Sequence, residues 1–224
     1  MIEYLVLGIC AVVILSTTSV VLWRKPNAVF RLRLAFAAII VPGIFGMVYL
    51  TTSTVITIVR AETHGPVHWH ADFQIYHCGT ALDLVNSSGL NNRVGTPLLH
   101  EHGDNRIHVE GTVMDIADVS LGHFFSAVGG EFTPISLRLP TSDQNFIIVK
   151  NGDLCPSGQP GRWQMFVYSV ASGNIVQRLV PLSADYHIAQ EVQVPPGDCI
   201  ILEFSDRVLK STEHMCSAYT TYDP

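Results

Sequence analysis

Histidines are the residues of this chain whose spacing most clearly suggests chemistry. All ten follow Arg60, and two pairs have the form His-x-His, namely His68 with His70 and His100 with His102. On a β-strand, residues i and i+2 share a face, so both imidazoles of such a pair can reach one ion. Imidazole nitrogen is a good ligand for zinc, copper, nickel and iron. The pattern therefore predicts a transition-metal site, with copper or zinc as the expected ion.

The expected ligands come from both pairs and from the next histidine along the chain. A single histidine on a strand is most often only solvated, whereas a group of them with acidic neighbours favours a bound cation. Glu101, Asp104 and Glu110 are those neighbours. We expect at least three ligands from this set: His68, His70, His100, His102 and His108.

Two further groups are weaker candidates. His123 lies in a segment, 120–128, whose pattern predicts a short helix, and it could join the site if that helix packs over the sheet. The run Glu213-His214-Met215-Cys216 offers soft ligands that suit copper, but we also expect its cysteine to form a disulfide.

The outer part of the chain has mainly β signals. Residues 68–76 alternate polar and apolar, which predicts a strand with His68, His70 and Asp72 on one face and Trp69 and Phe73 on the other. A hairpin partner at 81–85 and further strands are expected at 106–110, 135–139, 146–149, 163–170, 174–179, 188–194 and 199–204. We expect an α+β domain, with an all-β sandwich as the alternative.

These motifs resemble a poorly characterised group of prokaryotic secreted or membrane-anchored proteins. The resemblance covers roughly 66–129 and consists of His68-Trp69-His70-Ala71, then Leu99-His100-Glu101-His102, Ile107-His108-Val109-Glu110 and Leu121-Gly122-His123-Phe124-Phe125. This sequence differs in having Glu101 where the group usually has Thr, and a Gly before Asp104. The resemblance implies a shared domain with a shared histidine site and names no reaction.

The first sixty residues predict a transmembrane hairpin. Residues 2–23 carry one charge, Glu3, and 34–59 carry none, so each run is long enough to cross a bilayer. The segment 24–33 between them has four positive charges and no negative one, which predicts a cytoplasmic loop. Both termini and the domain 61–224 would then lie on the periplasmic or extracellular side of the cell (inner) membrane. A cleaved signal peptide is the alternative for the first run, although its basic residues follow the apolar stretch.

Charge and cysteine content limit the kinds of partner and the cellular compartment that we expect for this chain. Segment 61–224 has eight Lys and Arg against eighteen Asp and Glu, a formal charge of −10, which argues against nucleic acid as a partner. Four of the five cysteines fall in this segment, and on an oxidising face they predict two disulfides with three possible pairings. Because Cys155 and Cys199 both follow Gly-Asp turns, we favour that pair, which leaves Cys78 with Cys216.

Three functional classes fit these features. The first is a metal-binding domain anchored in the lipid, and the second is an accessory subunit of a larger membrane complex, respiratory or photosynthetic for example, with or without metal. A hairpin favours lateral membrane partners, because one helix is enough for an anchor. The third class, a metal-dependent enzyme, lacks a complete catalytic signature such as His-Glu-x-x-His, so we expect no catalytic residues.

Overall fold

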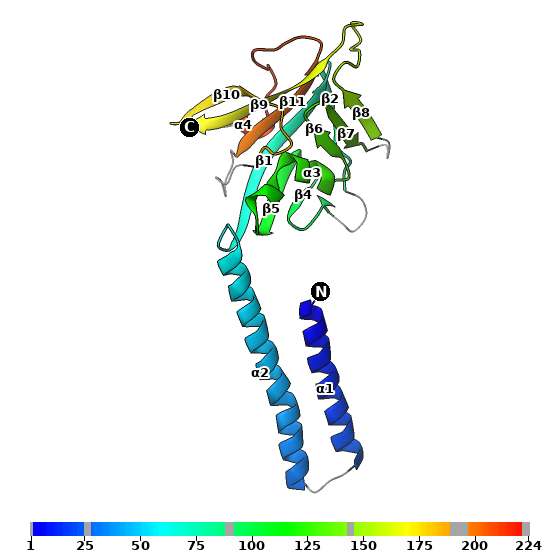
Figure 1. Cartoon of the computed structure of the whole chain (residues 1–224), viewed down its shortest axis with the longest axis vertical. Helices are drawn as coiled ribbons and strands as arrows, with labels where there is room; N and C mark the ends of the chain where they lie inside the picture. Colours follow the sequence, from blue (N-terminus) through cyan, green and yellow to red (C-terminus); the bar gives the residue numbers. More distant parts are fainter. Residues whose placement is uncertain (1, 25–27, 88–91, 143–145, 189–196, 221–224) are drawn as a thin grey trace. The chain divides into compact units, whose positions relative to one another are not determined.

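The structure is a computed structural model that describes residues 2–24, 28–87, 92–142, 146–188 and 197–220 (Figure 1). By their internal contacts the residues form two compact units, Met1–Arg60 and Ala61–Pro224. The first unit contains the two long helices and the second contains the strands.

The helical unit consists of α1 (Ile2–Arg24) and α2 (Ala28–Arg60). Both are long and apolar enough to cross a membrane, a test that a signal sequence near the N-terminus also passes. In α1 the hydroxyls of Thr17, Thr18 and Ser19 each donate to the carbonyl oxygen four residues earlier. Pro42 lies inside α2 and removes one backbone donor there.

The basic loop is shorter than predicted. We expected a loop over 24–33, but Arg24 belongs to α1 and residues 28–33 form the first turns of α2, while 25–27 lie outside the described residues. Helical hydrogen bonds satisfy the backbone at a membrane surface, and the long stems of Arg31 and Arg33 can carry their charges toward water, so the basic residues did not require a loop.

The second unit is built on one large mixed sheet and a smaller antiparallel one. In the large sheet the strand order is β10-β9-β11-β1-β5-β4-β3, and β2 pairs with the far half of β1. Only the β1–β11 pair is parallel among the described strands. The strands of the large sheet are β1 (Pro66–His77), β2 (Thr80–Leu82), β3 (Val94–Gly95), β4 (Leu99–Glu101), β5 (Arg106–Thr112), β9 (Arg162–Ala171), β10 (Asn174–Val180) and β11 (Asp198–Ser205).

The main core lies on one face of this sheet. Burial alternates along β1 as the sequence predicts, with Trp69, Ala71, Phe73 and Ile75 buried and His70, Asp72 and Gln74 partly exposed. Covering this face are η1 (Ile116–Val119), α3 (Leu121–Ala127) and the small sheet of β6 (Glu131–Thr133), β7 (Ser136–Pro140) and β8 (Phe146–Lys150). Phe124 of α3 packs edge-on against Phe73 at 5.4 Å between ring centroids. Short helices beside mixed sheets make this an α+β domain.

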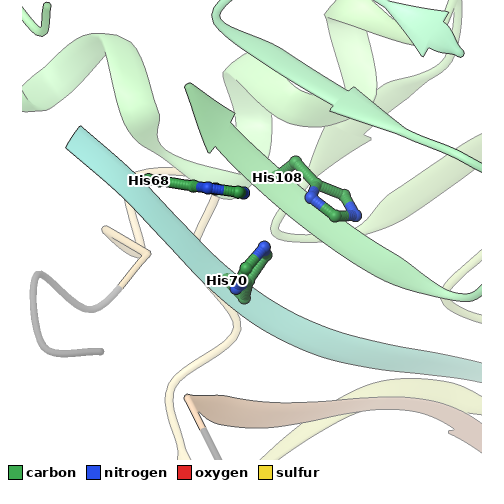
Figure 2. A group of neighbouring side chains, drawn as sticks. All are labelled: His68, His70 and His108. Atoms are coloured by element: carbon green, nitrogen blue, oxygen red, sulfur yellow. The ribbon is translucent and has the colours of Figure 1, made fainter. Parts of the chain in front are cut away.

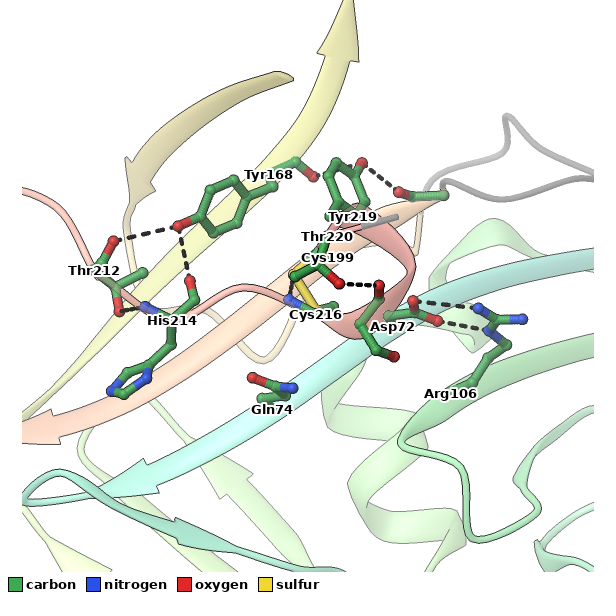
Figure 3. The surroundings of a disulfide bond; sticks show 12 residues. Asp72, Gln74, Arg106, Tyr168, Cys199, Thr212, His214, Cys216, Tyr219 and Thr220 are labelled. Carbon is green, nitrogen blue, oxygen red and sulfur yellow. Dashed lines mark hydrogen bonds and ion pairs between the residues drawn. A yellow bond between two sulfur atoms is a disulfide. The ribbon is translucent and has the colours of Figure 1, made fainter. Parts of the chain in front are cut away.

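A second, smaller core lies on the opposite face. Cys199 and Ile201 of β11 pack there with Phe166 of β9 and with Cys216 and Tyr219 from the C-terminal segment, which ends in α4 (Ser217–Thr220). Tyr76 of β1 borders this cluster, so the cluster shares its face with His68 and His70. Figure 3 shows the segment lying over the strands beside Asp72 and Gln74.

The disulfides join Cys78 to Cys155 and Cys199 to Cys216, so the favoured pairing of Cys155 with Cys199 is wrong. The reason is which face of the sheet each sulfur occupies. Cys78 and Cys155 pack with the main core, whereas Cys199 and Cys216 belong to the smaller core on the other face. Turn residues around a cysteine do not determine its face.

Candidate metal centre

Strand register places three histidines in one row across the sheet. His70 of β1 lies directly opposite His108 of β5, and His100 of β4 lies directly opposite His108 on its other side. Directly paired residues of adjacent strands point to the same face. The three imidazoles therefore project together on the face away from the main core, with His108 in the middle.

His68 and His102, the two pair members that lie outside this row, are found on opposite sides of it. Because β1 and β4 both run antiparallel to β5, they run parallel to each other. His68 precedes His70 by two residues, whereas His102 follows His100 by two. His68 therefore lies level with Glu110, and His102 lies toward the Arg106 end of β5.

Ring contacts confirm that the five imidazoles form one cluster. His108 lies 4.7 Å from both His70 and His102 between ring centroids, and it stacks on His100 at 5.4 Å. Within each pair the rings also touch, at 4.5 Å for His68 with His70 and 4.9 Å for His100 with His102. Figure 2 shows His68 and His70 on β1 facing His108 on β5.

Two sets of three ligand atoms have the spacing that a metal ion needs. One set is His68, His70 and His108, and the other is His100, His102 and His108. In each set one nitrogen per residue lies within 4.8 Å of the others. Nitrogens bound tetrahedrally at about 2.0–2.1 Å lie about 3.4 Å apart, so small side-chain rotations bring such a set to bonding distance.

Several ring nitrogens in the cluster are buried without a hydrogen-bond partner. They are Nδ1 of His70 and both nitrogens of His108. Leaving a buried polar atom unpaired costs about 1–3 kcal/mol, so such atoms are rare unless they have a role. A metal ion would satisfy them. His102 differs, because its Nδ1 lies 2.6 Å from the carbonyl oxygen of Asn92, the usual second contact of a metal-binding histidine.

Two carboxylates lie beside the imidazoles. Glu110 contacts His68 Nε2 at 3.1 Å through one oxygen and His100 Nε2 at 3.8 Å through the other. Asp104 approaches His108 Nε2 to 3.8 Å, a distance too long for a hydrogen bond. Glu101, the third acidic neighbour in the sequence, faces away. It is 1% exposed, it accepts from the Gly103 amide, and burial raises the pKa of its carboxyl group.

Burial keeps the central imidazoles in the neutral form that binds metals. It is the largest cause of the lowered pKa of His70, His100 and His108, and for His108 the pKa falls to about 4. Neighbouring imidazoles lower these values further, His68 for His70 and His70 for His108. At pH 7 these rings are neutral and need lose no proton before one nitrogen coordinates a cation.

An ion pair that the sequence analysis did not identify borders the row. Arg106 donates from Nε to Asp72 Oδ1 at 2.6 Å and from a second guanidinium nitrogen to Oδ2 at 3.3 Å, and the two residues are cross-strand partners (Figure 3). Asp72 and Arg106 alternate with His70 and His108, so they share the histidine face. Predicting this ion pair requires the β1–β5 register, which local sequence patterns do not determine.

The weaker candidates do not join the cluster. His123 is on α3, which covers the main core on the other face, and its Nδ1 lies 2.9 Å from Ser120 Oγ. Cys216 is in a disulfide and cannot act as a thiolate ligand. His214 stacks on Tyr76 with 3.5 Å between ring centroids.

No family model, curated protein or solved structure matches this chain. The histidine cluster and the two apolar helices are therefore the features of the chain that indicate its function.

Proposed function

We propose that this protein is a membrane-anchored metal-binding domain that holds copper or zinc in its histidine cluster on the extracytoplasmic side. One observation carries the proposal: His108 stands at the centre of four other imidazoles, and buried ring nitrogens of His70 and His108 have no hydrogen-bond partner among the described residues. Nitrogen ligands with adjacent carboxylates suit copper and zinc. The formal charge of −10 on 61–224 favours cations as well.

The proposed location is supported by helices and by disulfides. Two N-terminal helices are long and apolar enough to span a bilayer. The β domain has two disulfides, which persist in oxidising compartments such as the periplasm and are rare in the cytosol.

Elemental analysis of the full chain, purified in mild detergent without added metal, tests the proposal. We expect near-stoichiometric copper or zinc in the wild type and a loss of at least tenfold in a His70→Ala/His108→Ala variant. His64→Asn is the matched control, since His64 is exposed, lies outside the cluster and has a positive φ that Asn tolerates. Wild-type protein that holds no metal and takes up neither ion on titration would refute the proposal.

The second candidate, a subunit of a larger membrane complex, is favoured by an apolar groove between α1 and α2. This groove has a volume of about 440 Å³ and is lined by Val6, Ile9, Cys10, Val13, Val41, Pro42 and Phe45. We propose that a helix of another subunit fills it. Mass spectrometry of co-purifying proteins tests this: a fixed partner that is lost in Val13→Trp while metal content is unchanged supports it, and purification without any partner contradicts it.

A further inference from the structure

The histidine cluster is divided into two sets of three, and this division suggests more than one ion. Among the described residues, the two sets with metal-ligand spacing share only His108. His68 and His70 lie on the β1 side of His108, and His100 and His102 lie on the β4 side.

Neither of the two sets with metal-ligand spacing among the described residues contains both His68 and His102, so the five imidazoles do not converge on one point. His68 lies level with Glu110, and His102 lies toward Arg106, four residues away along β5 and two strands across. A rise of about 3.3 Å per residue and a spacing of about 4.8 Å between strands separate the backbones of His68 and His102 by about 16 Å. The ligand nitrogens of one zinc or copper ion lie within about 4.2 Å of each other, twice the metal–nitrogen distance, so side chains from backbones this far apart would have to point directly at each other to share an ion.

His108 is the ring that both sets need, and both of its nitrogens are available. Nδ1 and Nε2 are each buried and without a hydrogen-bond partner. A histidine that binds one metal almost always donates its other ring N–H to a carboxylate, carbonyl or water. His102 has such a partner in the Asn92 carbonyl, whereas the nearest carboxylate to His108 Nε2 is 3.8 Å away.

We propose that the cluster is a dinuclear centre in which the imidazolate of His108 bridges two transition-metal ions. His68 and His70 complete one site, His100 and His102 complete the other, and Glu110 lies where one of its oxygens faces each pair. His108 coordinates the first ion through one nitrogen as neutral imidazole. When its other nitrogen coordinates the second ion, its N–H proton passes to solvent. This inference rests on the proposed function, since it specifies how many ions the same cluster holds.

Titration of the metal-free full chain in detergent with Cu(II), followed by copper analysis and electron paramagnetic resonance, tests the bridge. We expect saturation at two copper ions per chain. The first equivalent gives the resonance of an isolated Cu(II) ion, and the second removes most of that signal because an imidazolate couples the two spins antiferromagnetically.

Variants at the two ends separate the sites. His68→Ala and His102→Ala should each lower the capacity from two copper ions to one and restore the isolated signal. His108→Gln should abolish the coupling, and His64→Asn should behave as wild type. Circular dichroism establishes that each variant is folded.

The possible outcomes distinguish the bridge from the proposed function. Saturation at one copper per chain, or two coppers with a full uncoupled signal, overturns the bridge and leaves a metal-binding cluster in place. Failure to bind any copper or zinc overturns both.

Discussion

Three imidazoles of the cluster are kept neutral by burial, and this makes the stability of the metal-free protein depend on pH. His70, His100 and His108 have lowered pKa values, with burial the largest cause in each case. His100 is only 1% exposed. In the unfolded chain the same rings reach water and regain a pKa near 6.5. Below that pH the unfolded state therefore binds more protons than the folded state.

The metal-free protein should lose stability as the pH falls from 7 to 4.5. Each of the three histidines contributes stability above its unfolded pKa of about 6.5, and this is lost as the pH falls toward the folded value, about 4 for His108. For His108 alone the change is up to about 3 kcal/mol. Urea unfolding followed by the fluorescence of buried Trp69 and Trp163 measures it. His108→Gln should show a shallower dependence, and equal unfolding midpoints at pH 5 and pH 7 would contradict the account.

The sequence predicts which histidines belong to the cluster, but it does not predict how they are arranged around His108. The i, i+2 spacing places each His-x-His pair on one strand face, and all five expected histidines lie together in the structure. Which of them meets His108 depends on the β1–β5 and β4–β5 registers, which arise from long-range pairing. The different roles of Glu101 and Glu110 depend on the same registers, because a shift of one residue exchanges the faces.

At the scale of elements, alternation and turn signals predict most of the strands. The segments expected at 68–76, 106–110, 163–170 and 199–204 correspond to β1, β5, β9 and β11 within one or two residues. The strand expected at 188–194 lies outside the described residues except for Ile188, which is in no strand. Strand order and the parallel β1–β11 pair could not be predicted, because local patterns carry no information on which distant strands become neighbours.

The two disulfides should stabilise the domain to different extents. Cys78–Cys155 closes a segment with a sequence separation of 77, and Cys199–Cys216 closes one of 17. Loop-closure entropy in the unfolded chain gives about 4.5 kcal/mol for the first and about 3 kcal/mol for the second. Chemical denaturation of the Cys78→Ala/Cys155→Ala and Cys199→Ala/Cys216→Ala variants compares them. A larger loss from the second pair would show that native packing, and not chain entropy, dominates their effect.

At the scale of the whole molecule, composition separates an apolar helical unit from an acidic β domain, and internal contacts divide the chain at Arg60 and Ala61. Four basic residues lie among 24–33, and positive charge of this kind favours the cytoplasmic side of a membrane. We therefore propose that the histidine cluster and both disulfides lie on the outer side.

A reporter fused after Pro224 tests this orientation. Alkaline phosphatase is active only where its own disulfides form, so the fusion should be active in cells. Replacing Arg24, Lys25, Arg31 and Arg33 with Gln should lower that activity, because the charges that retain the connecting segment in the cytoplasm are gone. A cytoplasmic reporter such as green fluorescent protein, fused at the same residue, should be dark when exported through the general secretory route. The reverse pattern would place the domain inside the cell.

Calorimetric titration of the metal-free full chain with Zn(II) or Cu(II) shows whether the histidine cluster binds a metal ion. We expect saturable binding by the wild type and by His64→Asn, at least tenfold weaker binding by His70→Ala/His108→Ala, and lower affinity at pH 4, where protons compete for His108, whose pKa is about 4. Equal binding by the double variant, or no binding by the wild type, would contradict a metal site at these histidines.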